Sequence, residues 1–129
     1  MRQIAMLVAA AALVLGACAT GQPIYNVTEA PIILTPGKTA TMQQVQTAII
    51  RAGTRLGWQM QPEGPGKLSG RLAVRQHLAV IDVEHNTKAY SIKYRDSSGL
   101  NAQDGTIHKN YNGWIQNLDK AIRSELTLI

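Results

Sequence analysis

Residues 58–95 constrain the fold most, because apolar and polar residues alternate along much of this segment. Alternation with a period of two puts every second side chain on the same face of a β-strand. Turn-forming residues divide the segment into four stretches, and short connections of this kind favour an antiparallel meander. The predicted strands are residues 58–61, 67–75, 78–85 and 90–95, separated at residues 62–66 and 86–88 by turns rich in Pro, Gly and Asn.

Helical spacing is found on both sides of this segment. Thr41 and Gln44 have the spacing of a capping box, and an apolar stripe then recurs every three or four residues until Gly57. A second stripe begins between Asp104 and Ile107 and continues for about twenty residues. Gly113 within it predicts close packing against another element. We therefore expect an α+β two-layer sandwich, an antiparallel sheet of three to four strands flanked by an N-terminal and a long C-terminal helix.

The chain begins with one basic residue, Arg2, and an unbroken apolar run over residues 4–15. A membrane-spanning helix needs about 20 apolar residues, so this run has the length of a signal-peptide core. The sequence Leu15-Gly16-Ala17-Cys18 resembles the lipobox of bacterial lipoproteins. The resemblance implies that residues 1–17 are removed and that Cys18 carries thioether-linked diacylglycerol and an amide-linked acyl chain such as palmitate. The alternative is an ordinary signal peptide followed by a chance cysteine.

The same resemblance predicts where the protein resides. Ala19 differs from the aspartate that marks inner-membrane retention, which favours the outer membrane with the domain facing the periplasm. Pro23, Pro31 and Pro36 interrupt the next segment. We expect three parts: a signal peptide at 1–17, a lipidated cysteine and tether at 18–38, and a periplasmic domain at 39–129.

Charge and cysteine content limit the classes of partner. The chain has 13 Lys and Arg residues against 8 Asp and Glu, a formal net charge of +5. No two basic residues are adjacent, and an exported protein does not meet nucleic acid, so we expect no nucleic-acid partner. Cys18 is the only cysteine, so the domain has no internal disulfide and depends on its core.

Basic residues lie on the polar face of the predicted sheet. If the last three strands are neighbours, Asp82 and Glu84 lie between two basic rows. One interpretation is a basic platform for an anionic ligand or an acidic partner. The favoured alternative is cross-strand charge pairing, worth about 0.2–1 kcal/mol per pair. The residues of the two rows are Arg71 with Arg75 and Lys93 with Arg95.

The sequence offers little support for a metal site or a hydrolase. His77 and His85 occupy opposite ends of one predicted strand, roughly 25 Å apart, too far for one metal ion. Ser97 and Ser98, with Asp96 and His108, include the residue types of a nucleophile–base–carboxylate site, but no GxSxG motif surrounds either serine. We therefore predict no metal, no cofactor and no enzymatic activity.

The start of the final helix is the remaining candidate site. His108 and Asn112 are four residues apart and share one stripe of the helix. One interpretation is a small polar network with the 94–97 strand end and a shallow binding patch. The favoured alternative is core packing, because Tyr111 and Trp114 belong to the apolar stripe. Residues 107–115 together with 90–94 resemble a group of small proteobacterial outer-membrane lipoproteins of unassigned function. The resemblance covers most of residues 39–129 and contains no catalytic motif.

These observations predict a lipid-anchored, non-enzymatic envelope protein whose domain binds another envelope component, most simply a protein. Lipid on Cys18 would hold the domain at the membrane and raise its effective concentration near partners there. Two alternatives stay open. One is a binder of lipopolysaccharide or peptidoglycan through the basic sheet face, and the other is a hydrolase acting on envelope material.

Overall fold

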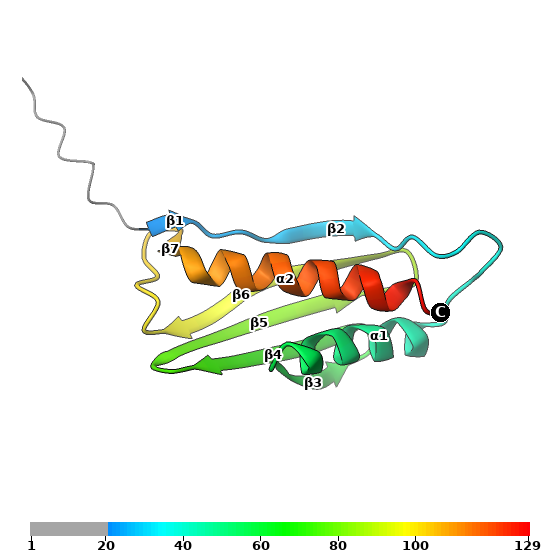
Figure 1. Ribbon diagram of the computed structural model, residues 1–129, viewed down its shortest axis with the longest axis horizontal. Coiled ribbons are helices and arrows are strands. Elements are labelled where there is room, and N and C mark those ends of the chain that lie inside the picture. Colours follow the sequence, from blue (N-terminus) through cyan, green and yellow to red (C-terminus); the bar gives the residue numbers. More distant parts are fainter. Residues whose placement is uncertain (1–20) are drawn as a thin grey trace, which may run out of the picture.

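The computed structural model describes residues 21–129 (Figure 1). The signal peptide and the lipidation site at Cys18, both expected from the sequence, lie outside these residues. Two helices and seven strands form the described part, in the order β1 (Gly21–Pro23), β2 (Val27–Pro31), α1 (Met42–Arg55), β3 (Gln59–Gly64), β4 (Lys67–Val74), β5 (His77–His85), β6 (Ala89–Ser98), β7 (Thr106–His108) and α2 (Lys109–Leu126).

The main sheet has five antiparallel strands in the order β2-β6-β5-β4-β3, and β1 and β7 form a second, two-stranded sheet. The prediction of a sheet of three to four strands, flanked by an N-terminal and a C-terminal helix, is therefore wrong, because the sheet has five strands. The additional strand comes from the segment expected to be a tether. Val27 and Ala30 of β2 are buried and pair with Ile92 and Tyr90 of β6. Pro31 is compatible with this strand because β2 lies at the sheet edge.

The predicted meander is confirmed for β3, β4, β5 and β6. Alternate residues of β4 and β5 are buried, among them Leu68, Leu72, Ile81 and Val83. β6 continues to Ser98, through residues expected to end the sheet, because its backbone pairs with β5 as far as Leu78. A register shift between Val80 and Ile81 marks a bulge in this pairing.

Helix α1 has the ends that the sequence predicts. Thr41 Oγ1 accepts a hydrogen bond from Gln44 N at 3.1 Å, and Gln44 Oε1 accepts one from Thr41 N at 2.9 Å, which completes the capping box. Gly57, just beyond the C-terminal Leu56, has a φ of +91°, a conformation that glycine adopts without strain.

Helix α2 begins later than expected. Thr106 pairs with Pro23 as part of β7, so the helix starts only at Lys109, although Ile107 is buried as predicted. The expected close packing at Gly113 is also wrong, because a Cβ placed there meets no atom within 4 Å.

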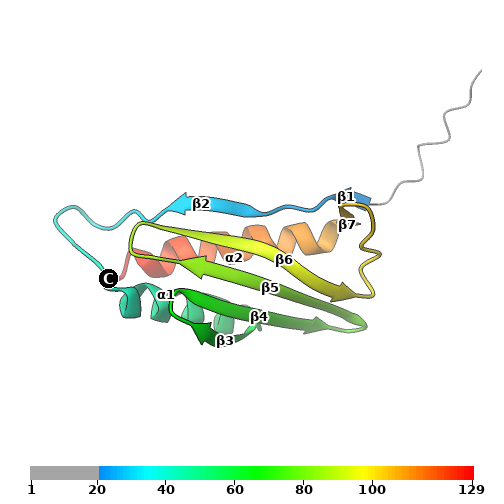
Figure 2. The same ribbon diagram turned by 180° about the vertical axis from the view of Figure 1, so that it is seen from behind.

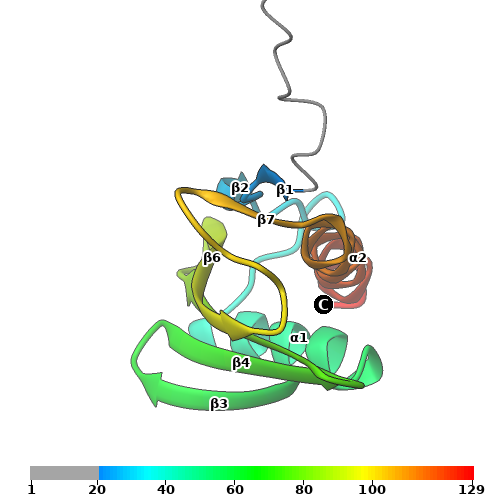
Figure 3. The same cartoon turned by 90° about the vertical axis from the view of Figure 1, so that its left-hand side faces the viewer.

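Both helices cover one face of the five-stranded sheet (Figures 1 and 2), which curves around them when viewed from its end (Figure 3). The core lies between these layers and includes Ile49 of α1, Ile81 and Ile92 of the sheet, and Ile115 and Leu118 of α2. In Figures 1 and 2, β1 and the C-terminus lie at opposite ends of the molecule. No helix within residues 21–129 is long and apolar enough to cross a membrane.

Candidate functional site

The outward face of the sheet carries paired charges. Arg95 donates to both carboxylate oxygens of Glu63 on β3, at 3.2 and 2.6 Å, and also to Asp82 on β5. The hydrogen bonds with Glu63 and Asp82 raise the pKa of Arg95, and the bond from Arg95 lowers the pKa of Glu63. Lys93 Nζ lies 3.4 Å from Glu84 Oε2. The cations of β6 are thus matched by carboxylates of β5 and β3.

The two arginines of the other basic row lie in different structural elements. Arg71 is exposed on β4, opposite Val80, and makes no salt bridge within residues 21–129. Arg75 lies beyond the strand, in the two-residue turn between β4 and β5, with a φ of +56°. The four basic residues considered as a platform therefore do not present one continuous surface of free positive charge.

His108 and Asn112 contact the N-terminal segment, whereas the sequence suggested contacts with residues 94–97. Asn112 Oδ1 accepts from Tyr25 N at 3.0 Å, and Asn112 Nδ2 donates to the Pro23 carbonyl at 2.9 Å. His108 caps α2 by accepting from Asn110 N at its Nδ1, at 3.1 Å. These contacts attach β1 to the start of α2.

His77 and His108 lie close together at this end of the molecule. Their rings stack with centroids 6.1 Å apart, and the indole of Trp114 lies 6.3 Å from His77. His77 Nδ1 is 2.8 Å from the carbonyl oxygen of Gly99. Within residues 21–129, no three His, Cys, Asp or Glu side chains are arranged to hold a metal ion. The pair therefore joins the start of β5 to β7 and α2.

The serine, carboxylate and histidine side chains considered for a hydrolase each make separate contacts with nearby residues. Ser97 Oγ lies 2.8 Å from the Tyr94 hydroxyl, and Asp96 Oδ1 accepts from Ser97 N at 2.8 Å. His108 Nδ1 is the helix cap described above. A nucleophilic site requires the base to contact both the nucleophile and the carboxylate, and none of these contacts does so.

Sequence reasoning missed a buried polar cluster between β6 and α2. The Tyr90 hydroxyl donates to Asp119, whose other carboxylate oxygen lies 3.1 Å from Arg123 Nη2. Burial and the bond to Asp119 raise the pKa of Tyr90. The spacing of Asp119 and Arg123, four residues apart on a helix, is a signal for such a pair. The cluster fixes α2 to the sheet.

The sequence suggested His85 only as a possible metal ligand and gave no prediction that its ring is buried. It is buried, neither ring nitrogen has a hydrogen-bond partner among residues 21–129, and burial lowers its pKa. It borders an open pocket of about 270 Å³ whose polar lining includes Glu29, Lys67 and Glu84. Since both ring nitrogens are fully covered, they do not present a donor or acceptor to that pocket.

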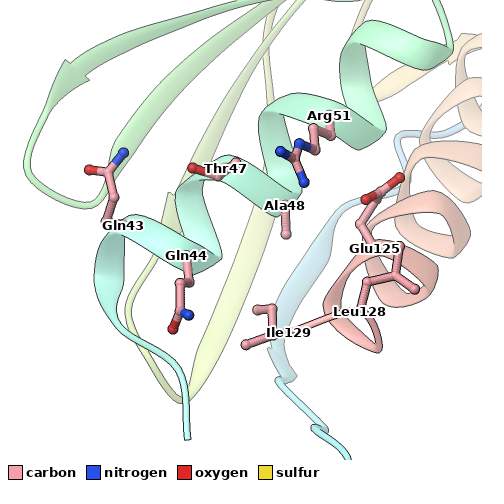
Figure 4. A pocket seen from close by; sticks show the side chains of 8 residues that line it. All are labelled: Gln43, Gln44, Thr47, Ala48, Arg51, Glu125, Leu128 and Ile129. Carbon is pink, nitrogen blue, oxygen red and sulfur yellow. The ribbon is translucent and has the colours of Figure 1, made fainter.

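Two apolar side chains are exposed around the C-terminal end of α2, which we call the distal end and define by exposed Ile33 and Leu128, half-buried Ile129 and buried Leu126. Ile33 is 73% exposed and Leu128 is 77% exposed. A pocket of about 190 Å³ lies between Pro31, Ile33, Arg123, Leu126 and Thr127. A second, of about 230 Å³, lies between α1 and α2 (Figure 4). Figure 4 shows Gln44, Thr47 and Arg51 on its α1 side, with Glu125 and Leu128 opposite.

Comparisons with protein-family models, with curated proteins and with solved structures found no match to this chain.

Proposed function

We propose that the protein is a lipid-anchored, non-enzymatic component of the bacterial envelope whose domain binds a second envelope protein through the distal end. The observation that carries the proposal is the exposure of Ile33 and Leu128 beside two pockets. Large apolar side chains grouped at one surface are typical of sites where another protein is bound. The lipobox-like sequence supports attachment to the membrane through Cys18.

The position of the distal end supports this assignment. β1 follows Cys18 closely in the sequence, and the distal end lies at the other end of the molecule (Figures 1 and 2). A domain anchored near β1 would leave Ile33 and Leu128 accessible to a partner. The apolar pockets would accept an apolar segment of that partner, and exposed Arg51 would favour carboxylates beside it.

Two observations favour this proposal over the alternatives. The ion pairs of Arg95 and Lys93 leave little free charge on the sheet face for an anionic polymer. The hydrolase residue types make local structural contacts instead of a nucleophile–base pair. Both observations support a binding protein and give no reason to assign chemistry.

Site-specific photo-crosslinking in cells tests the proposed partner surface. A crosslinking amino acid at Ile33 or Leu128 is expected to give a discrete product with one protein, and the same probe at exposed Ala73 on the sheet is the matched control. Leu128→Asp in the Ile33-probe protein should remove the product while the protein level is unchanged. Absence of a discrete product from both distal positions would contradict the proposal.

Lipidation requires a separate measurement. Intact-mass analysis of the native protein should show a chain that begins at Cys18 and carries added acyl mass. Cys18→Ser should move the protein from the detergent-rich to the aqueous phase on detergent phase separation. An unmodified mass for the native protein would exclude the anchor.

A further inference from the structure

We infer that the end of the domain opposite the distal end lies directly on the membrane, where it contacts the headgroups of anionic phospholipids. We call it the anchor end and define it by Gly21, Arg75, His77, His108 and Lys109. The inference rests on the proposed lipid on Cys18 and adds to it an orientation, a contact surface and a ligand class. Figure 3 shows the molecule from this end.

The first argument is the short distance along the chain from the lipid to the fold. Gly21 already pairs with His108, and Ile24 N donates to the Gly105 carbonyl at 2.9 Å. Only Ala19 and Thr20 lie between Cys18 and Gly21. At about 3.3–3.6 Å per residue, three steps span at most about 11 Å, whereas a tether reaching residue 38 would span about 70 Å. An acylated Cys18 therefore keeps the anchor end at the lipid surface.

The contacts around β1 make this attachment firm. The side-chain amide of Asn112 bonds both Tyr25 N and the Pro23 carbonyl, so residues just after β1 are fixed to α2. His108, the partner of Gly21, also stacks on His77 at the start of β5. Because β1, β5 and α2 meet here, a lipid attached just before Gly21 orients the whole domain as well as one strand.

The second argument is the chemistry of the exposed side chains. Arg75 and Lys109 are exposed on the β4–β5 turn and at the start of α2, two residues before His77 and directly after His108. Half-buried Trp114 lies beside His77. Basic residues near an anionic bilayer bind its phosphates, and tryptophan is suited to the boundary between lipid and water. Asp104, in the loop before β7, is negatively charged and therefore opposes this attraction to anionic lipid.

The orientation also sets the height of the distal end. Helix α2 has 18 residues and extends from the anchor end towards the distal end (Figure 1). At about 1.5 Å per residue it is roughly 27 Å long. The partner proposed above would then be bound roughly that far from the headgroups, and still close to the membrane.

Fluorescence quenching in vesicles tests the orientation. The lipidated protein is reconstituted into phosphatidylcholine–phosphatidylglycerol vesicles that contain headgroup spin-labelled lipid. A fluorophore is attached to Asn110→Cys at the anchor end or, as the matched control, to Thr39→Cys in the β2–α1 connection at the other end. We expect strong quenching at position 110 and little at position 39. Equal quenching at the two positions would overturn the orientation.

A charge series tests the anionic lipid. The lipid on Cys18 keeps the anchor end near the surface, and the basic residues set the equilibrium between headgroup-bound and unbound orientations of the tethered domain. At about 1 kcal/mol for each basic residue, removal of one charge should lower this bound-to-unbound ratio, measured by quenching at position 110, about fivefold. Arg75→Gln with Lys109→Gln should therefore lower it about 25-fold. Lys38→Gln with Lys88→Gln, an equal charge change in segments at the other end, should leave it unchanged. An unchanged ratio in the first pair would overturn the lipid contact.

The two proposals fail in distinguishable ways. If Cys18 carries no lipid, the native protein stays in the aqueous phase and does not remain with vesicles, and the anchored function fails. If the protein remains with the vesicles but position 110 is not quenched, the anchor stands and only the inferred orientation is wrong.

Discussion

His85 illustrates how one buried ionisable residue makes stability depend on pH. Burial lowers its pKa below the ordinary value of 6.5, and neither ring nitrogen has a partner. In the pH range between the folded and unfolded pKa values, the unfolded chain binds more protons, so acidification favours unfolding. The free energy of unfolding should therefore fall as the pH decreases through 6.5 towards the folded pKa.

Chemical denaturation at several pH values checks this prediction against His85→Leu, which removes the titrating ring. The variant should be at least as stable as the wild type at pH 7, since no hydrogen bond is lost. Its stability should fall less steeply below pH 6.5. Parallel curves for the two proteins would show that protonation of His85 does not contribute.

Two buried tyrosines differ in a way that the same substitution reveals. The Tyr90 hydroxyl donates to Asp119, whereas the Tyr111 hydroxyl has no partner within the part of the chain that the structure describes. A hydrogen bond to a charged group is worth about 1.5–3 kcal/mol, so Tyr90→Phe should lower the free energy of unfolding by that amount. Tyr111→Phe removes an unsatisfied hydroxyl and should be neutral or stabilising. Urea unfolding measures both, and equal losses would contradict the assigned partners.

Two helical glycines test packing at the scale of single elements. Gly113→Ala in α2 should stabilise the protein by about 1 kcal/mol, because alanine favours the helix and its Cβ meets no atom within 4 Å. Gly53→Ala in α1 has the same propensity gain, but its Cβ would lie 2.7 Å from Cγ and Sδ of Met60. Thermal unfolding should show a smaller gain or a loss for Gly53→Ala. Equal gains would show that Met60 adjusts without cost.

The elements that the sequence predicts well are those with strong periodicity or local capping. The Thr41–Gln44 box is a local interaction, so it identifies the start of α1 without knowledge of the rest of the fold. Alternation locates β4 and β5 for the same reason. β7 was not predicted because Thr106, Ile107 and His108 become a strand only through pairing with β1, a partner distant in the sequence.

For the candidate sites too, contacts set by the order of neighbouring strands could be predicted, whereas contacts between residues distant in the sequence could not. The order of β4, β5 and β6 is enough to predict charge pairing on the sheet face, and the ion pairs of Lys93 and Arg95 agree with it. The contact between His77 and His108 joins residues with no shared periodicity. The distal end depends on how Ile33 and Leu126 come together around one pocket. No sequence pattern encodes either arrangement.

For the molecule as a whole, the main question is whether residues 21–31 belong to the fold or only connect it to the membrane. The prolines of this segment suggested a tether, yet Val27 is 6% exposed and pairs with Ile92. An edge strand accepts proline at positions that need no hydrogen bond, which a sequence pattern does not distinguish from a linker. This difference determines how far the domain can move from the lipid, and therefore where it can meet a partner.

Val27→Asp and Thr28→Asp separate the two interpretations, since they place the same charge at neighbouring residues. If the segment were a tether, both variants would unfold as the wild type does. In the folded structure Val27 is buried and Thr28 is exposed. An unpaired buried carboxylate should lower the free energy of unfolding by about 3 kcal/mol or more, while an exposed substitution changes it by about 0.5 kcal/mol or less. Urea denaturation of the mature chain measures both values, and a tolerated Val27→Asp would remove β2 from the sheet.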